Sequence, residues 1–276
     1  MKSFIMALCV FLSTISFAQS VKTFMPKNNL HEQDGLFDNG MTEQDFNDII
    51  DQVQNYYGYV VNQYGATLQI NRLWKNATVN AQAYQQGNTW MVDMFGGLAR
   101  RPEITFDGFA MVVCHEVGHH LGGFPNNDWA ANEGQSDYWA MLACAKNIWG
   151  NQSNKVDYVD PTAKKLCDQY VGQNNSLCYR EMNAGISLAN LLAALGGEYA
   201  SITTPDKTKV SRTDGAHPKA QCRLDTYVAG TLCNAQWDDY VIPQSERESA
   251  NYTCVSASST SYDIKARPRC WFKPSF

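Results

Sequence analysis

The sequence of 276 residues has no apolar run as long as the roughly 18 to 20 residues that a membrane-spanning helix needs. It has no cluster of lysine and arginine either, and its formal net charge is −5. The first absence excludes a multi-pass membrane protein, and the second argues against nucleic acid or an anionic membrane surface as the main partner. Apolar residues make up 44% and charged residues 18% of the chain, which is typical of a globular protein rather than a disordered one.

Internal repeats and long low-complexity linkers are also missing, so we expect residues 19–276 to form a single domain. The beginning of the chain differs. It has a basic residue at Lys2, a short apolar run over residues 4–15 and small residues ahead of a cleavage point after Ala18. This pattern predicts that residues 1–18 are a signal peptide. We therefore expect a protein exported to the periplasm or the medium, without membrane insertion after cleavage.

Eight of the nine cysteines lie beyond the predicted signal peptide. An even number in an exported protein suggests up to four disulfides, with on the order of a hundred possible pairings. The chain has no C-x2-C pair, which argues against a cysteine-bound metal cluster. Three pairs are close in sequence, and bonding between nearest neighbours would join Cys167 to Cys178, Cys222 to Cys233 and Cys254 to Cys270.

Helical and extended patterns follow one another along the chain. Thr42 can cap a helix that ends near Gly65, and Asp107 can cap another that ends at Gly122-Gly123. The order of helix, strands and then helices predicts an α+β fold. The expected strands are 68–73, 79–84 and 90–95, and further helices are expected over 130–148 and 182–195.

The residues that carry chemistry are His115, Glu116 and His119, which form an H-E-x-x-H motif inside the second predicted helix. Two histidines four residues apart project from one face of a helix, so both imidazoles can reach one zinc ion. Glu116 is then placed to take a proton from a water that zinc activates. The alternative is a helix with incidental histidines, which is the weaker interpretation because the chain has five histidines in all.

Zinc needs a third protein ligand. The metzincin continuation is excluded, because Gly122 fits but Pro125 stands at the ligand position and cannot coordinate a metal. The next predicted helix offers Glu133 and Asp137, which are four residues apart and share one face. Their carboxylates are either part of the metal site or an acidic first turn that favours the helix dipole.

These motifs together resemble the gluzincin metallopeptidases, and within them the family of the CAAX prenyl endopeptidase and its soluble periplasmic relatives. The likeness covers about residues 79–224. It includes Asn80-Ala81 and Gly87 before the motif, and His217-Pro218 with Arg223 after it, which match the family's His-Pro-x4-Arg signature. The chain departs from the family in its short gap between His119 and Glu133, its lack of membrane helices and its cysteines.

The resemblance implies a zincin-like core in which His115, His119 and Glu133 hold one zinc ion. It assigns Asp137 to the free N–H of His115, which fixes the tautomer of that ring.

By the same resemblance, His217 donates a hydrogen bond to the oxyanion of the reaction, and Arg223 orients or braces its segment. An edge strand of a small sheet beside the motif helix, expected at Trp90–Phe95, would bind an extended substrate by strand addition.

We therefore expect a zinc-dependent endopeptidase with Glu116 as general base and a protein or peptide as substrate. A non-catalytic binding or structural protein stapled by zinc is one alternative, and a zinc hydrolase of non-peptide bonds is another. The sequence does not define the cleavage preference or the oligomeric state.

Overall fold

A computed structural model of the chain describes residues 20–33, 35, 39–256 and 263–275. The predicted signal peptide, residues 1–18, lies outside these described residues. Among the helices of the described part, none is long and apolar enough to cross a membrane. The fold combines helices with small sheets, as the α+β prediction expects.

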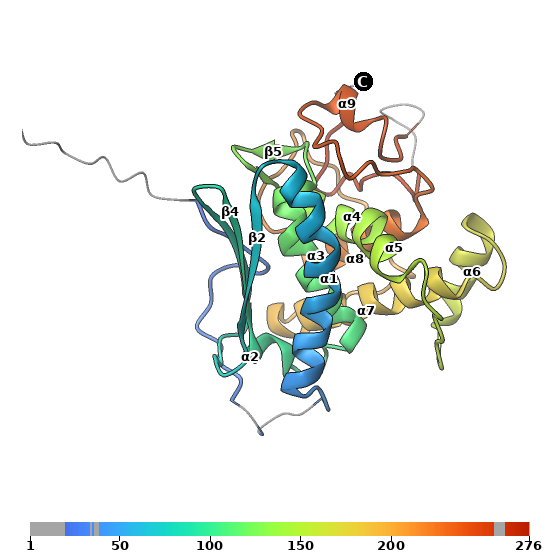
Figure 1. Ribbon diagram of the computed structural model, residues 1–276. Helices are drawn as coiled ribbons and strands as arrows, with labels where there is room; N and C mark the ends of the chain where they lie inside the picture. The colour runs from blue at the N-terminus through green and yellow to red at the C-terminus, as the bar shows by residue number, and fades with distance from the viewer. Residues whose placement is uncertain (1–19, 34, 36–38, 257–262, 276) are drawn as a thin grey trace, which may run out of the picture.

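The first helix, α1 (Glu43–Gln63), begins where its cap predicts. The Thr42 hydroxyl accepts a hydrogen bond from the Asp45 N–H, and the Asp45 carboxylate accepts one from the Thr42 N–H. This reciprocal arrangement satisfies two amides that the helix cannot pair by itself. The apolar face of α1 packs on strand β2 and helix α3, so α1 covers part of the core between the sheet and the other helices (Figure 1).

The main sheet has four strands in the order β1-β3-β4-β2. β3 and β4 form an antiparallel hairpin around Gly87, whose φ of +58° suits glycine, and β4 also pairs in parallel with β2. The three predicted strands are confirmed to within two residues. The strands are β1 (Lys22–Thr23), β2 (Thr67–Leu73), β3 (Ala81–Gln86) and β4 (Thr89–Phe95).

The prediction that Trp90–Phe95 forms an edge strand is wrong. β4 lies between β3 and β2, and its residues from Met91 onward are buried. The reason is the parallel pairing of β2 with β4, which covers the edge that a simple hairpin would leave free. The edge of β3 is the one beside the motif helix, and β1 pairs with it.

The remaining elements are mostly helices. α3 is capped by the Thr105 hydroxyl, which accepts the Gly108 N–H at 3.0 Å, and not by Asp107, whose carboxylate binds Arg180. The predicted helix over 130–148 begins only at Glu133 and is broken by a π-helical segment. The bounds are α2 (Gly96–Ala99), α3 (Phe106–Leu121), β5 (Asn126–Asn127), β6 (Ala130–Ala131), α4 (Glu133–Trp139), η1 (Ala140–Ala145), α5 (Lys146–Trp149), α6 (Pro161–Tyr170), α7 (Ser176–Gly196), α8 (Ala220–Leu232) and α9 (Glu246–Ser249).

Four disulfides link the eight cysteines, of which only the predicted Cys167–Cys178 pair is confirmed. The predicted pairs of Cys222 with Cys233 and of Cys254 with Cys270 are wrong. Helix α8 holds Cys222 and Cys233 at its opposite ends, about 16 Å apart, and a disulfide spans only about 4.4–6.8 Å between Cα atoms. The other three disulfides are Cys114–Cys144, Cys222–Cys270 and Cys233–Cys254.

Candidate metal centre

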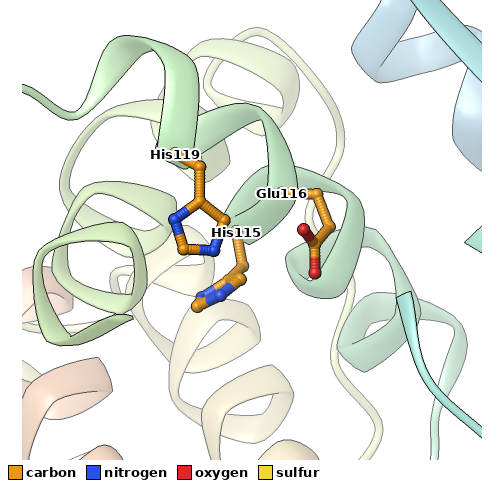
Figure 2. Close-up of side chains that lie close together, drawn as sticks. All are labelled: His115, Glu116 and His119. Carbon is orange, nitrogen blue, oxygen red and sulfur yellow. The ribbon is translucent and has the colours of Figure 1, made fainter. Parts of the chain in front are cut away.

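Helix α3 presents His115 and His119 side by side on one face, with Glu116 next to them (Figure 2). All three side chains are fully buried, and their ligand atoms lie within 4.8 Å of one another. The His115 Nδ1–H donates to Asp137 Oδ1 and the His119 Nδ1–H donates to the Ala131 carbonyl, each at 2.8 Å. These bonds leave the Nε2 lone pair of each ring free for another partner.

Glu133 reaches the same point from the first turn of α4. Its Oε2 atom lies 3.3 Å from His115 Nε2 and 3.7 Å from His119 Nε2. Two ligands at about 2.0–2.1 Å from a tetrahedral zinc ion stand roughly 3.3 Å apart, so these spacings suit one ion between the three side chains.

The close approach of α3 and α4 depends on a glycine inside the motif. A Cβ atom at Gly118 would lie 3.0 Å from the Trp139 ring and 3.2 Å from the Ser136 carbonyl oxygen. Both residues belong to α4, so a larger side chain would push the two helices apart. Gly118 therefore allows the helix that carries Glu133 to pack against the helix that carries the histidines.

The buried atoms at this point have no hydrogen-bond partner among the described residues. They are Nε2 of His115 and His119, Oε2 of Glu133 and both carboxylate oxygens of Glu116. A buried polar atom left unpaired costs about 1–3 kcal/mol, so five such atoms at one place need an explanation. A cation held by two imidazoles and a carboxylate would satisfy the nitrogens and Glu133. His115, Glu116 and His119 form a group that can hold a metal ion. Glu133 lies close enough to both imidazoles to add its carboxylate, and histidine nitrogens with a carboxylate are donors that zinc accepts.

The charges of His119 and Glu133 suit metal binding. Burial would lower the pKa of His115, but Asp137 raises it to about 9, so this imidazole has to lose a proton to coordinate a metal. Burial lowers the pKa of His119 to about 3, which keeps this imidazole neutral and able to coordinate. Burial alone would raise the pKa of Glu133, but the adjacent His119 and His115 lower it to about 2, so the carboxylate is ionised. Burial raises the pKa of Glu116 to about 8, which makes it a base that can hold a proton near neutral pH.

Asp137 is held in turn by Arg223 from helix α8. The guanidinium donates from Nε to Asp137 Oδ2 and from Nη2 to Oδ1, each at 2.7 Å, in a buried bidentate pair. Burial would raise the pKa of Asp137, but Arg223 and His115 together lower it. Arg223 therefore acts on the site through the carboxylate that orients His115.

His217, in the loop before α8, also reaches the site. Its Nε2 atom lies 3.5 Å from Glu133 Oε2 and 2.6 Å from the Thr23 carbonyl oxygen, and its side chain is 22% exposed. The structure thus brings together all seven residues that the sequence singles out, from α3, α4 and the region around the start of α8. They are His115, Glu116, His119, Glu133, Asp137, His217 and Arg223.

The sequence analysis missed Thr23 and Phe24. Both belong to the N-terminal segment, and Phe24 packs its ring edge-on against His115 with the ring centroids 5.2 Å apart. Nothing in the local sequence marks these residues, because their contacts with His217 and Arg223 span 194 and 199 positions.

Comparisons with protein-family models, curated proteins and solved structures found no match. The resemblance to gluzincins therefore rests on the motif residues of the sequence.

Proposed function

We propose that this protein is an exported zinc-dependent endopeptidase of gluzincin type with a zincin-like fold. The observation that carries the proposal is the convergence of unpaired, buried donor atoms from His115, His119 and Glu133 beside the carboxylate of Glu116. Structural zinc sites are usually closed by four protein ligands, whereas catalytic sites keep one position open. The presence of an unpaired carboxylate next to a three-ligand set favours catalysis over a purely structural role.

Each residue has a distinct part in the proposed reaction. One bound zinc ion, held by His115, His119 and Glu133, would polarise the scissile carbonyl and lower the pKa of water to about 7. Glu116 takes the proton of the attacking water and returns it to the leaving amine. His217 donates a hydrogen bond to the developing oxyanion.

The four disulfides support export, because such bonds persist in oxidising compartments. The substrate we propose is a protein or peptide that binds in an extended conformation beside the sheet. Strand addition recognises the peptide backbone and needs a sheet edge next to the reacting groups. The side of β3 that pairs with the two-residue strand β1 lies in this position, since β3 packs against helix α3.

The test is digestion of an unfolded protein by the zinc-loaded wild type and by Glu116→Gln, read by mass spectrometry. This variant keeps the size of the side chain and removes its basicity. We expect kcat to fall by about 100- to 10,000-fold while bound zinc and the thermal unfolding midpoint stay unchanged. Glu43→Gln, an exposed carboxylate in the first turn of α1, is the matched control and should cut like the wild type.

Internal cuts that persist in Glu116→Gln would refute the assignment of the general base. If no folded, zinc-bound form of the protein, the wild type and the form with its N-terminal segment released included, cuts proteins or peptides, the endopeptidase proposal is contradicted. If chelation also unfolded that protein, the zinc-stapled structural alternative would gain.

A further inference from the structure

The N-terminal segment Ser20–Met25 lies along the sheet edge that borders the metal centre. β1 pairs antiparallel with β3, with Lys22 opposite Ala83 and Thr23 opposite Gln82. The Phe24 N–H continues the ladder by donating to the Ala81 carbonyl at 3.1 Å. The chain's own backbone therefore occupies the β3 edge as an outer strand.

The other side of this segment contacts the residues of the proposed active site. The Thr23 carbonyl accepts a hydrogen bond from His217 Nε2 at 2.6 Å, and the Phe24 carbonyl accepts one from Arg223 Nη1 at 2.5 Å. His217 is the group that we assign to the oxyanion of the reaction. A peptide carbonyl of this chain thus takes the hydrogen bond that a substrate carbonyl would need.

The Phe24 side chain fixes the segment in place. It is fully buried, its ring meets His115 edge-on, and the Arg223 guanidinium carbon lies 4.4 Å from its centroid. The segment is also tied at both ends. The Met25 backbone exchanges two hydrogen bonds with the Asn80 side chain, and the Trp129 indole N–H donates to the Ser20 hydroxyl at 2.8 Å.

We propose that Ser20–Met25 occupies the groove in which an extended peptide substrate binds, and that it blocks the metal centre until it is displaced. The inference rests on the proposed function, because the groove is defined by the residues assigned to the reaction. Strand addition uses main-chain hydrogen bonds that any extended peptide can supply, so the chain's own strand and a substrate compete for the same positions. No disulfide of the described residues ties the segment down, since all of their cysteines lie at Cys114 or later.

The first experiment compares Phe24→Ala with Val21→Ala in the full, zinc-loaded chain. Val21 belongs to the same segment but its side chain is 45% exposed, so it provides the matched control. Both variants are made in the Glu116→Gln background, and the probe is a fluorescent peptide with the sequence of residues 20–29. Removing a large buried ring weakens the closed form, so we expect Phe24→Ala to bind the probe at least about tenfold more tightly than Val21→Ala.

Hydrogen exchange at the Phe24 amide, which the Ala81 carbonyl protects, reports whether the segment has been released. With Glu116 restored, Phe24→Ala should raise kcat/KM for peptide cleavage by a similar factor, while Val21→Ala stays at the wild-type value. Faster exchange without tighter probe binding would overturn the proposal, because the released segment would then not have covered a peptide site.

A second form covers the case in which Phe24→Ala does not fold. A recognition site for a specific protease is inserted after Gln33, and the chain is cut only after it has folded and bound zinc. We expect the released segment to leave on dilution, probe binding to rise, and added peptide 20–33 to reverse the change. A cut segment that stays bound and resists exchange with excess peptide would show a permanent structural strand and refute the proposal.

Different outcomes would refute the endopeptidase proposal and the proposal of a blocking strand. Tighter probe binding with no cleavage by any form would retain the occupied groove and reject the endopeptidase. Equal cleavage by the wild type, Phe24→Ala and the cut form would retain the endopeptidase and reject the blocking strand.

Discussion

Helix α3 carries buried histidines on two sides, and their surroundings differ. His115 and His119 each make a hydrogen bond through Nδ1 and direct Nε2 to the point that Glu133 also reaches. His120 is stacked between Trp90 and Trp129, with ring centroids 5.3 and 4.8 Å away. Its Nε2 lies 3.2 Å from the Met91 carbonyl, to which it can donate.

The comparison shows that residue type alone does not make a ligand. His119 and His120 are adjacent, but one step along an α-helix turns a side chain by about 100°. His119 therefore lies near Glu133 of α4, whereas His120 packs against the aromatic side chains of Trp90 and Trp129. A carbonyl or carboxylate at Nδ1 prepares an imidazole for a metal, whereas two flanking indoles hold the ring as part of the core.

Removing each histidine in turn tests whether the two sides of α3 differ in metal binding. We expect His119→Ala to weaken zinc binding by more than about a hundredfold, because one of three ligands is lost. His120→Ala should leave zinc affinity within a few-fold of the wild type, although it creates a cavity between the indoles. Competition with a fluorescent chelator measures both affinities, and equal losses in the two variants would contradict the separation of the two sides.

The acid response of His120 gives the next largest expected effect. Burial lowers the pKa of His120 to about 4, against an ordinary value of 6.5. As the pH falls from 6.5 to 4, the unfolded chain takes up a proton that the folded chain does not, so the free energy of unfolding decreases. This loss amounts to as much as about 3 kcal/mol in the wild type.

His120→Phe keeps a ring between the indoles and cannot take up this proton. Urea unfolding of the metal-free proteins at pH 7, 5.5 and 4 should therefore show that the free energy of unfolding of the variant rises relative to that of the wild type as the pH falls. All other titrating groups are shared, so they cancel in the difference. A difference that stays constant over this range would mean that His120 is not buried in its neutral form.

The parts of the fold that the sequence predicted depend on local patterns. Thr42 and the apolar periodicity that follows it define α1, and Gly87 defines the hairpin turn. Helix α8 was missed, because Lys219 offers no side-chain cap and a glycine, Gly230, lies near the end of the helix. That omission led directly to the wrong disulfides, since α8 separates Cys222 from Cys233.

The candidate site follows the same rule. The spacing of His115 and His119 is local and can be read from the sequence, and Glu133 follows closely after them. The edge beside the site cannot be read in this way, because it depends on β2 pairing with β4 and on β1 returning to β3. Neither the periodicity of Trp90–Phe95 nor the residues around Thr23 carry information on such pairings.

The smallest expected effect concerns Asp137, whose carboxylate accepts a hydrogen bond from His115. His120 has no such carboxylate partner among the described residues. Asp137→Asn keeps the shape of the side chain but removes the charge that orients His115 and pairs with Arg223. We expect zinc affinity to fall by about 10- to 100-fold, the usual effect of losing a hydrogen-bond partner of a metal ligand. Asp107→Asn is the matched control, because Asp107 also binds an arginine, Arg180, but lies away from the metal centre. An equal loss of zinc affinity in both variants would reflect general destabilisation by an unpaired arginine, whereas a loss in Asp137→Asn alone shows that the site histidines depend on their carboxylate and not only on being buried.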